Sequence, residues 1–456
     1  MGATVRRLAD ATPLRRGIAA AVGALLLLAS IAPCSTGSAQ AAEFFTLKGH
    51  GGPIMHIAVS PFSGRIATAS FDNSVGLWRD RTPVWLEGHA AAVNVVGFVD
   101  ADRLASAGDD FSVIIWNRAD GSHRTLTGHR GKVVALAVAP DRATIASASW
   151  DGSIGLWPLD GGEAVFLSGP SSGVNALAYA QDGKTLYAGY VDGSIRVWDL
   201  AERAVRRVLV RGGFGVNEIV LGGRDADGRP GWLAYGAVDG VTRVVEPDTG
   251  RAIRNLTVDR GPILALALDP SGRWLARGDG HGYITLFDTR DWHIERDFHA
   301  ALRGPIWALA FSADGTSILA GGIENIVYAW PIDLLSEFGP MADSAPAFLR
   351  NPAEMGNGER QFARKCSICH ALTDDRSRKA GPSLHGIFGR RAGSLPGYEY
   401  SATLEGSDLI WDASTIDRLF DLGPDHFIPG SKMPMQRITK ADDRRDLIEF
   451  LDKATR

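Results

Sequence analysis

The sequence predicts a protein of two domains, a long all-β repeat region followed by a small all-α domain. One pattern of short apolar strands recurs seven times along the middle of the chain. Residues 331–352, rich in Pro, Ala and Ser, break this pattern, and apolar residues with helical spacing follow them. The 456 residues exceed the usual size of a single core, and 45% hydrophobic and 22% charged residues are ordinary for a globular protein.

The N-terminus predicts a signal peptide over residues 1–41. Four arginines precede an apolar run at residues 17–31, and Ala39-Gln40-Ala41 is a small-residue cleavage pattern. The run is shorter than the roughly 20 residues that a membrane span needs. We therefore expect no transmembrane span and a soluble, periplasmic mature protein. The Arg15-Arg16 pair would also suit a twin-arginine signal, but we favour the general secretory route.

Cleavage after Ala41 leaves two cysteines, Cys366 and Cys369, and therefore excludes a larger disulfide framework. Lipoprotein anchoring through Cys34 is disfavoured because Pro33 stands where a small residue is required. The whole chain carries a net charge of -4, and loss of the basic leader, which carries four Arg and one Asp, leaves -7. This charge argues against nucleic acid as a partner.

The repeat region is predicted to consist of strands and turns. Each repeat ends in an apolar strand whose last residue follows a turn residue by six positions. The last residues are Trp78, Trp116, Trp157, Trp198, Val245, Phe287 and Trp330, and the turn residues are Asp72, Asp110, Asp151, Asp192, Asp239, His281 and Glu324. Most of the aspartates precede Gly or Asn, which indicates tight hairpins.

The repeats resemble the WD40 family. The resemblance is carried by the Gly-His pairs ending at His50, His89 and His129, by the hairpin aspartates and by Trp198-Asp199. It implies a seven-bladed β-propeller of four-stranded blades over residues 43–338, although the fifth to seventh repeats depart from the pattern. It also implies that the three histidines form structural hydrogen bonds within their blades. No catalytic constellation stands out, so the propeller is interpreted as a rigid docking platform.

The opening stretch "EFFTLKGH" is a single strand with no repeat of its own. After Trp330 the last repeat lacks a matching outermost strand. Pairing of the opening strand into the last blade would close the ring and leave no open sheet edge.

A linker is expected at residues 339–354 and the second domain at 355–456. Phe362 lies four residues before Cys366, while Leu447, Phe450 and Leu451 share one face of a closing helix. The domain is therefore predicted to have helices at both ends, around a cysteine motif.

The motif "KCSICH" is the attachment signature of c-type haem. Two thiols, Cys366 and Cys369, would add to the haem vinyl groups, and His370 would ligate the iron. A thioredoxin-like pair would need a βαβ context, which the sequence lacks. A structural zinc site would need further cysteine or histidine ligands at similar spacing. We therefore expect one haem c, attached covalently through two cysteines.

The second domain resembles class I cytochrome c almost throughout. "GERQFARKCSICH", "GPSLHGIFGRRAGSLPGYEYS", Trp411, "IPGSKM" and "DLIEFLDKAT" follow one another in the family's order. The resemblance implies that Met433 is the second axial ligand, with His370 as the first. Met435 and His426 are the alternatives.

Further positions carry over from the same resemblance. Pro382 corresponds to the residue whose carbonyl accepts a hydrogen bond from the ligand imidazole. Tyr398, Tyr400 and Trp411 correspond to residues that hold the haem propionates. Gly358 corresponds to the small residue at the crossing of the first and last helices.

Two departures from the family are visible. Leu419 or Phe420 stands where the family often has a tyrosine near the methionine sulfur. Asp417, Asp421 and Asp425 replace much of the lysine ring through which family members dock on oxidases. We therefore do not expect the partner to match that of a basic cytochrome.

The ligand set favours a periplasmic electron-transfer protein. An iron with both axial positions filled by protein has no open site for a substrate and moves single electrons. The propeller would dock a protein redox partner, whose identity the sequence does not give. The alternatives are an oxidoreductase in which the haem relays electrons from a substrate site on the propeller, and a scaffolding or redox-sensing protein.

Overall fold

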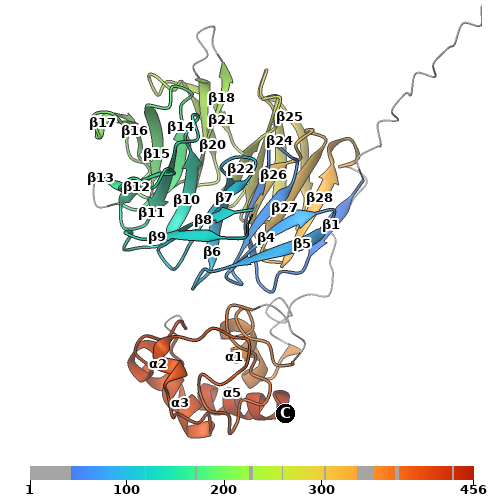
Figure 1. Ribbon diagram of the computed structural model, residues 1–456. Coiled ribbons are helices and arrows are strands. Elements are labelled where there is room, and N and C mark those ends of the chain that lie inside the picture. Colours follow the sequence, from blue (N-terminus) through green and yellow to red (C-terminus); the bar gives the residue numbers. More distant parts are fainter. Residues whose placement is uncertain are drawn as a thin grey trace, which may run out of the picture. The chain divides into compact units, whose positions relative to one another are not determined.

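The computed structural model describes residues 43–118, 120–169, 172–224, 230–258, 260–301, 304–335, 354–374, 379–433 and 436–456. The predicted signal peptide and all but the last residue of the predicted linker lie outside these ranges, so those boundaries stay predictions. The first part of the chain forms a seven-bladed β-propeller, and the C-terminal part forms a helical domain (Figure 1). No helix within the described ranges has both the length and the apolar character needed to cross a membrane.

Seven antiparallel sheets of four strands make up the propeller, which confirms the predicted fold. Six blades are built from consecutive strands. These are β2 (Ile54–Val59), β3 (Ile66–Ser70), β4 (Ser74–Arg79) and β5 (Thr82–Glu87); β6 (Val93–Phe98), β7 (Arg103–Gly108), β8 (Val113–Asn117) and β9 (His123–Leu126); β10 (Val133–Val138), β11 (Thr144–Ser149), β12 (Ser153–Pro158) and β13 (Val165–Ser168); β14 (Val174–Tyr179), β15 (Thr185–Tyr190), β16 (Ile195–Asp199) and β17 (Ala204–Val210); β18 (Val216–Arg224), β19 (Pro230–Ala237), β20 (Thr242–Val245) and β21 (Ala252–Leu256); and β22 (Ile263–Leu268), β23 (Trp274–Asp279), β24 (Tyr283–Asp288) and β25 (Ile294–His299).

The seventh blade joins the two ends of the propeller. It contains β26 (Ile306–Phe311), β27 (Ser317–Gly322) and β28 (Ile326–Pro331), and its fourth strand is β1 (Phe45–Lys48) from the start of the described chain. β1 pairs antiparallel with β28, with Leu47 opposite Val327, and Figure 1 shows the two strands side by side. The predicted closure is confirmed. A short 3₁₀ helix, η1 (Ile332–Leu334), follows β28.

Buried histidines tie the strands of the first three blades together. In the first blade, His50 Nδ1 lies 2.9 Å from Asp72 Oδ2, and His50 Nε2 lies 2.7 Å from Thr68 Oγ1. The Trp78 indole donates to the same hydroxyl at 2.8 Å. The equivalent sets are His89, Asp110, Ser106 and Trp116 in the second blade, and His129, Asp151, Ser147 and Trp157 in the third. The prediction that these histidines are structural is confirmed.

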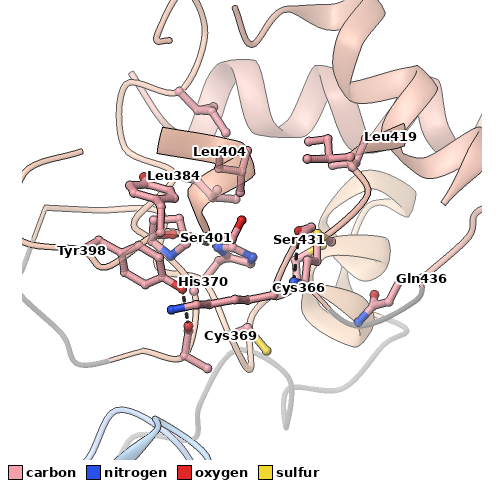
Figure 2. Close-up of a pocket in the computed structure, with 18 of the residues that line it drawn as sticks. Cys366, Cys369, His370, Leu384, Tyr398, Ser401, Leu404, Leu419, Ser431 and Gln436 are labelled. Atoms are coloured by element: carbon pink, nitrogen blue, oxygen red, sulfur yellow. Dashed lines mark hydrogen bonds between the residues drawn. The ribbon is translucent and has the colours of Figure 1, made fainter. Parts of the chain in front are cut away.

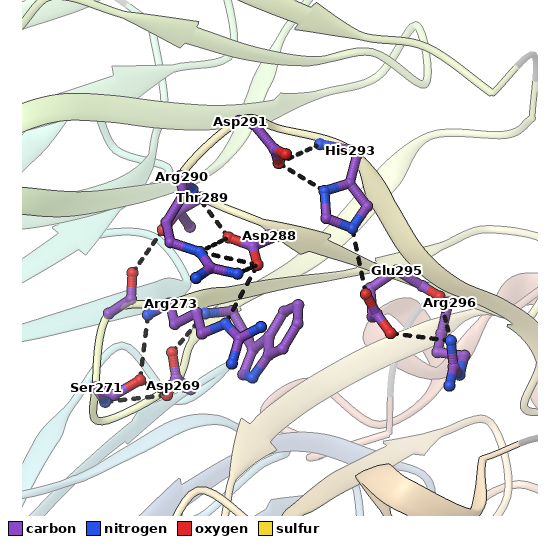
Figure 3. A network of polar contacts seen from close by, with 12 residues as sticks. Asp269, Ser271, Arg273, Asp288, Thr289, Arg290, Asp291, His293, Glu295 and Arg296 are labelled. Atoms are coloured by element: carbon purple, nitrogen blue, oxygen red, sulfur yellow. Dashed lines mark hydrogen bonds and ion pairs between the residues drawn. The ribbon is translucent and has the colours of Figure 1, made fainter.

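The sixth blade lacks this set and uses arginine in its place. Arg277, 1% exposed, occupies the strand position of Thr68, and its guanidinium donates to the Leu256 carbonyl and the Thr285 hydroxyl, both at 3.2 Å. At the end of this blade the buried Asp288 accepts hydrogen bonds from Arg273 and Arg290 (Figure 3). A blade that departs from the repeat pattern thus replaces the histidine set with other hydrogen bonds, although Arg277 Nη2 and Asp279 Oδ2 have no hydrogen-bond partner among the described residues.

The C-terminal domain is all-α, as predicted. Its helices are α1 (Asn357–Lys365), α2 (Ala402–Glu405), α3 (Ala413–Leu422), α4 (Pro424–Phe427) and α5 (Ala441–Ala454). Asp412 caps α3, because its carboxylate accepts from the Thr415 amide while the Thr415 hydroxyl accepts from the Asp412 amide. Buried residues of α1, α3 and α5, among them Phe362, Ile416 and Leu447, form one core.

The first and last helices of this domain cross closely at Gly358. A Cβ atom at this position would lie 2.0 Å from the Asp446 carbonyl oxygen and 2.8 Å from Phe450 Cβ. Next to the crossing, the Phe362 and Phe450 rings pack with centroids 5.7 Å apart. The crossing holds α1, and with it the cysteine motif that follows, against α5.

Candidate functional site

The cysteine motif follows directly on α1 and lines a pocket in the helical domain (Figure 2). The turn is fixed by the backbone, because the amides of Cys369 and His370 both donate to the Cys366 carbonyl, at 3.0 and 2.9 Å. Ser367 donates back to the Ala363 carbonyl at 2.7 Å. These bonds direct the two thiols and the imidazole towards the same pocket.

Both cysteines are free thiols; Cys366 is buried and Cys369 is half-buried. Burial raises the pKa of the Cys366 thiol to about 12 and that of Cys369 to about 11. Both groups are therefore protonated at neutral pH. No group of three or more His, Cys, Asp or Glu side chains suited to a metal ion occurs in the described ranges, so no zinc-type cluster accompanies the pair there.

His370 is held in one orientation. Its Nδ1 lies 2.8 Å from the Pro382 carbonyl oxygen, so Nδ1 carries the proton and donates, and Nε2 is left as a free lone-pair donor. Burial lowers the pKa of the imidazole, which keeps the ring neutral, and the Pro382 bond opposes this effect only in part. Gly381 lies against the ring, where a Cβ atom would be 2.4 Å from His370 Cε1.

Met433 lines the same pocket, in the loop after α4. Its amide donates to the Ser431 hydroxyl at 3.1 Å, which fixes the backbone next to the thioether. Of the two alternative ligands, His426 is 70% exposed, pairs with Asp425 and does not line the pocket. Met435 lies outside the described residues.

The predicted propionate-binding residues all line the pocket, but they differ in their contacts. The Tyr398 hydroxyl donates to the Ala380 carbonyl at 2.7 Å, so its proton is already engaged. The Tyr400 ring lies edge-on to Tyr398, with centroids 4.8 Å apart. Trp411 is partly buried against the domain core. Their roles towards a cofactor stay predictions.

Most of the remaining side chains in the pocket wall are apolar. These apolar side chains come from α2, α3, α5 and the loops of this domain: Leu384, Ile387, Leu404, Ile416, Leu419, Phe420, Ile428 and Leu451. Leu419 and Phe420, one of which the sequence places where a tyrosine was expected, thus both line the pocket.

Two polar atoms in the pocket wall have no partner among the described residues. They are the Ser401 hydroxyl oxygen and Gln436 Oε1, both buried. Unpaired buried polar groups are rare and often mark a missing ligand. An apolar wall, two thiols, a neutral imidazole, a thioether and these atoms together suit a flat, largely apolar group with polar substituents. The residues present therefore fit haem.

The acidic residues near α3 have a structural function that the sequence did not reveal. Arg444 of α5, whose side chain is 10% exposed, lies 2.8 Å from Asp417 and 3.0 Å from Asp421. These carboxylates join α3 to α5. Both carboxylates stay partly exposed, at 41% and 48%, so their place in a docking face stays a prediction.

Comparison with protein families identifies both parts of the chain. The family of the WD domain, G-beta repeat, matches residues 42–79, 81–117, 121–158, 163–199 and 295–330. The fifth blade and the first three strands of the sixth lie outside these matches, although both blades are four-stranded sheets like the others. The cytochrome c family matches residues 355–455.

Individual relatives resemble the C-terminal domain alone. Cytochrome c of Sesamum indicum is 41% identical over 106 residues, which are 23% of this chain and 93% of the relative. Cytochrome c type-1 of Ascaris suum is 37% identical over 97 residues, 21% of this chain and 85% of the relative. Cytochrome c of Ginkgo biloba is 38% identical over 104 residues, 23% and 91% of the two chains. Through its C-terminal domain, the chain belongs to the cytochrome c family.

Proposed function

We propose that this chain carries single electrons through one haem c, bound covalently by Cys366 and Cys369. The observation that supports this function is the convergence of two thiols, an oriented imidazole and the Met433 thioether on one apolar pocket. When bound, this group supplies a one-electron ferric/ferrous couple.

The residues of the pocket have distinct tasks in this proposal. His370 provides Nε2 to the iron while the Pro382 carbonyl holds Nδ1–H, which fixes the ring and strengthens it as a ligand. Met433 provides a thioether, a ligand that favours the reduced state and raises the potential. Since both axial positions are taken by protein, no site remains for a substrate, and the chain acts as a carrier and not as an enzyme.

The apolar wall excludes water from the cofactor. Low polarity around the iron disfavours the extra charge of the ferric state and therefore adds to the effect of the thioether. Leu419 and Phe420, which line the pocket and share a core cluster with Met433, offer no hydroxyl and contribute by exclusion of water.

We further propose that the mature protein is periplasmic and that its propeller docks a protein redox partner. The predicted signal peptide at residues 1–41 supports export. Export also agrees with the haem motif, because c-type haem is attached outside the cytoplasm. The propeller supports docking because it is a closed ring of seven four-stranded blades.

The test is the haem content of the full chain after export in a host that matures c-type cytochromes. We expect one haem per chain by the pyridine haemochrome assay, retained after extraction with acidified acetone. Cys366→Ser combined with Cys369→Ser should abolish retention. Cys34→Ser, in the leader, is the matched control and should keep the parent haem content. Haem that the solvent extracts from the parent chain would contradict covalent attachment.

A further inference from the structure

Four apolar side chains stand exposed on one end of the propeller. Trp150, Val191 and Val238 directly follow the second strand of the third, fourth and fifth blades, and Phe214 lies in the loop before β18. Their exposed fractions are 54%, 53%, 50% and 59%. In an up-and-down blade, the hairpin after the second strand and the loop that leads to the next blade lie at the same end, so these residues share one face.

Two glycines lie between three of these side chains, Trp150, Val191 and Val238. A Cβ atom on Gly173 would lie 3.3 Å from Val191 Cγ2 and 3.5 Å from Trp150 Cδ1. A Cβ atom on Gly215 would lie 3.4 Å from Val238 Cγ2. The glycines therefore form a low floor between the apolar side chains. We call this surface, made of Trp150, Val191, Phe214 and Val238 over Gly173 and Gly215, the apolar trough.

Trp150 is held rigidly although half of it is exposed. Its indole Nε1 donates to Asn175 Oδ1 at 3.0 Å, and Asn175 in turn donates to the Val216 carbonyl at 3.0 Å. The Lys132 ammonium lies 5.5 Å from the Trp150 ring centroid. A rigid aromatic side chain loses little conformational entropy on binding, which is typical of residues that dominate interface energies.

The charged side chains beside the trough differ in their exposed fractions. The Asp151 and Asp239 side chains are 15% and 13% exposed. They are engaged by Ser153 and by Arg243, respectively. Burial acts to raise the pKa of Asp151, but hydrogen bonds from Ser153 and from the Arg130 amide outweigh it and lower the pKa to about 2. The Asp151 and Asp239 carboxylates are thus turned inward, whereas Asp192, next to Val191, is 40% exposed and pairs with Arg196.

The cations of this face point outward. Arg130 and Arg211 are exposed, and within the described residues neither guanidinium takes part in an ion pair. They flank the trough, since the Arg130 amide bonds Asp151 next to Trp150, and Arg211 lies three residues before Phe214. A surface with an apolar centre and a cationic rim is complementary to one with an apolar centre and an acidic rim.

We propose that the apolar trough docks the redox partner of this chain, a protein whose own contact surface is an apolar patch rimmed by carboxylates. This inference rests on the proposed function, because the partner exchanges electrons with the haem domain of the same chain. The trough provides the apolar contact and Trp150 its centre. Arg130 and Arg211 steer the encounter, so association weakens as ionic strength rises.

The experiment measures how fast the reduced full chain is reoxidised by fractions of the source cells' extract, followed through the haem spectrum. We expect Val191→Asp to slow this reaction about tenfold or more, because it places a charge in the centre of an apolar contact. Val84→Asp, at a 59% exposed position on β5, is the matched control and should react at the parent rate. Thermal unfolding of both variants checks that the propeller is intact.

A photo-crosslinking amino acid at residue 214 of the full chain identifies the occupant. We expect one adduct, with a protein of acidic sequence that reoxidises the purified chain and whose adduct disappears in Val191→Asp. An adduct with a second copy of this chain, or with its own haem domain, would overturn the proposal. Equal rates for Val191→Asp and Val84→Asp would overturn it as well. If the parent chain retains its haem but no fraction reoxidises it, the proposed function itself fails.

Discussion

Replacing Gly358 with alanine tests the helix crossing that holds the cysteine motif in place. The new Cβ atom would lie 2.0 Å from the Asp446 carbonyl oxygen, whereas ordinary contacts of this kind are near 3.4 Å. The clash is with backbone, which no side-chain rotation relieves. Helices α1 and α5 must therefore separate by about 1 Å, which loosens the packing of Phe362 on Phe450.

Two terms of opposite sign decide the result. Alanine in a helix interior is favoured over glycine by about 1 kcal/mol. Overpacking of a tight core costs about 1 to 3 kcal/mol, and a displaced helix pair belongs at the upper end of that range or beyond. We therefore expect Gly358→Ala to lower the free energy of unfolding of the helical domain by about 2 kcal/mol.

The assay is a urea titration of the full chain, followed by far-ultraviolet circular dichroism, in which the helical domain contributes most of the helix signal. Gly356→Ala is the matched control, since a Cβ atom there meets no other heavy atom within 4 Å. Gly356 is the N-cap of α1, so its replacement by alanine should lower the free energy of unfolding by at most about 1 kcal/mol. A Gly358→Ala chain as stable as the parent, or more stable, would refute the close crossing.

Three further perturbations test the propeller and the haem pocket. Burial raises the pKa of Glu218 to about 8, so the stability that depends on its protonated form is complete below about pH 4.5 and lost as pH rises through 8. Urea titrations at pH 6 and pH 9 measure this pH dependence of the free energy of unfolding. Glu218→Gln should remove up to about 2 kcal/mol of it, which is less than the full pKa shift implies because the side chain is partly exposed. Leu47→Ala, at a 2% exposed position on the closing strand, should cost about 3 kcal/mol and speed proteolysis near β1; an unchanged cleavage rate would contradict closure through this strand. Gly381→Ala should displace the His370 ring and break its hydrogen bond to the Pro382 carbonyl, which would increase the high-spin fraction in the optical spectrum. A spectrum like that of the parent chain would mean that the pocket accommodates the added methyl group without moving the ring.

The propeller was predictable where its stabilising contacts are local in sequence. The hairpin aspartate, the Gly-His pair and the strand-ending tryptophan recur at fixed spacing because they bond within one blade, as His50, Asp72 and Trp78 do. The sixth blade shows the limit of this reasoning. Arg277 performs the same task with a different side chain, and its partners Leu256 and Thr285 become apparent only once the strands are paired.

In the haem pocket, too, some residues could be predicted from the sequence and others could not. The two thiols and the imidazole are adjacent in the chain, so their common site follows from spacing alone, while Met433 came from resemblance to a family. The proximity of Gly381 to the His370 ring and the unpaired atoms of Ser401 and Gln436 had no sequence signal. They depend on loops that approach one another only in the folded domain. The engagement of Asp417 by Arg444 was hidden for the same reason.

The central claim is that His370 and Met433 together close both axial positions of the iron. Exposure of the reduced full chain to carbon monoxide at neutral pH tests it most directly. We predict an unchanged optical spectrum for the parent chain and a carbon monoxide complex for Met433→Ala. A parent chain that takes up carbon monoxide with Met433 intact would contradict it.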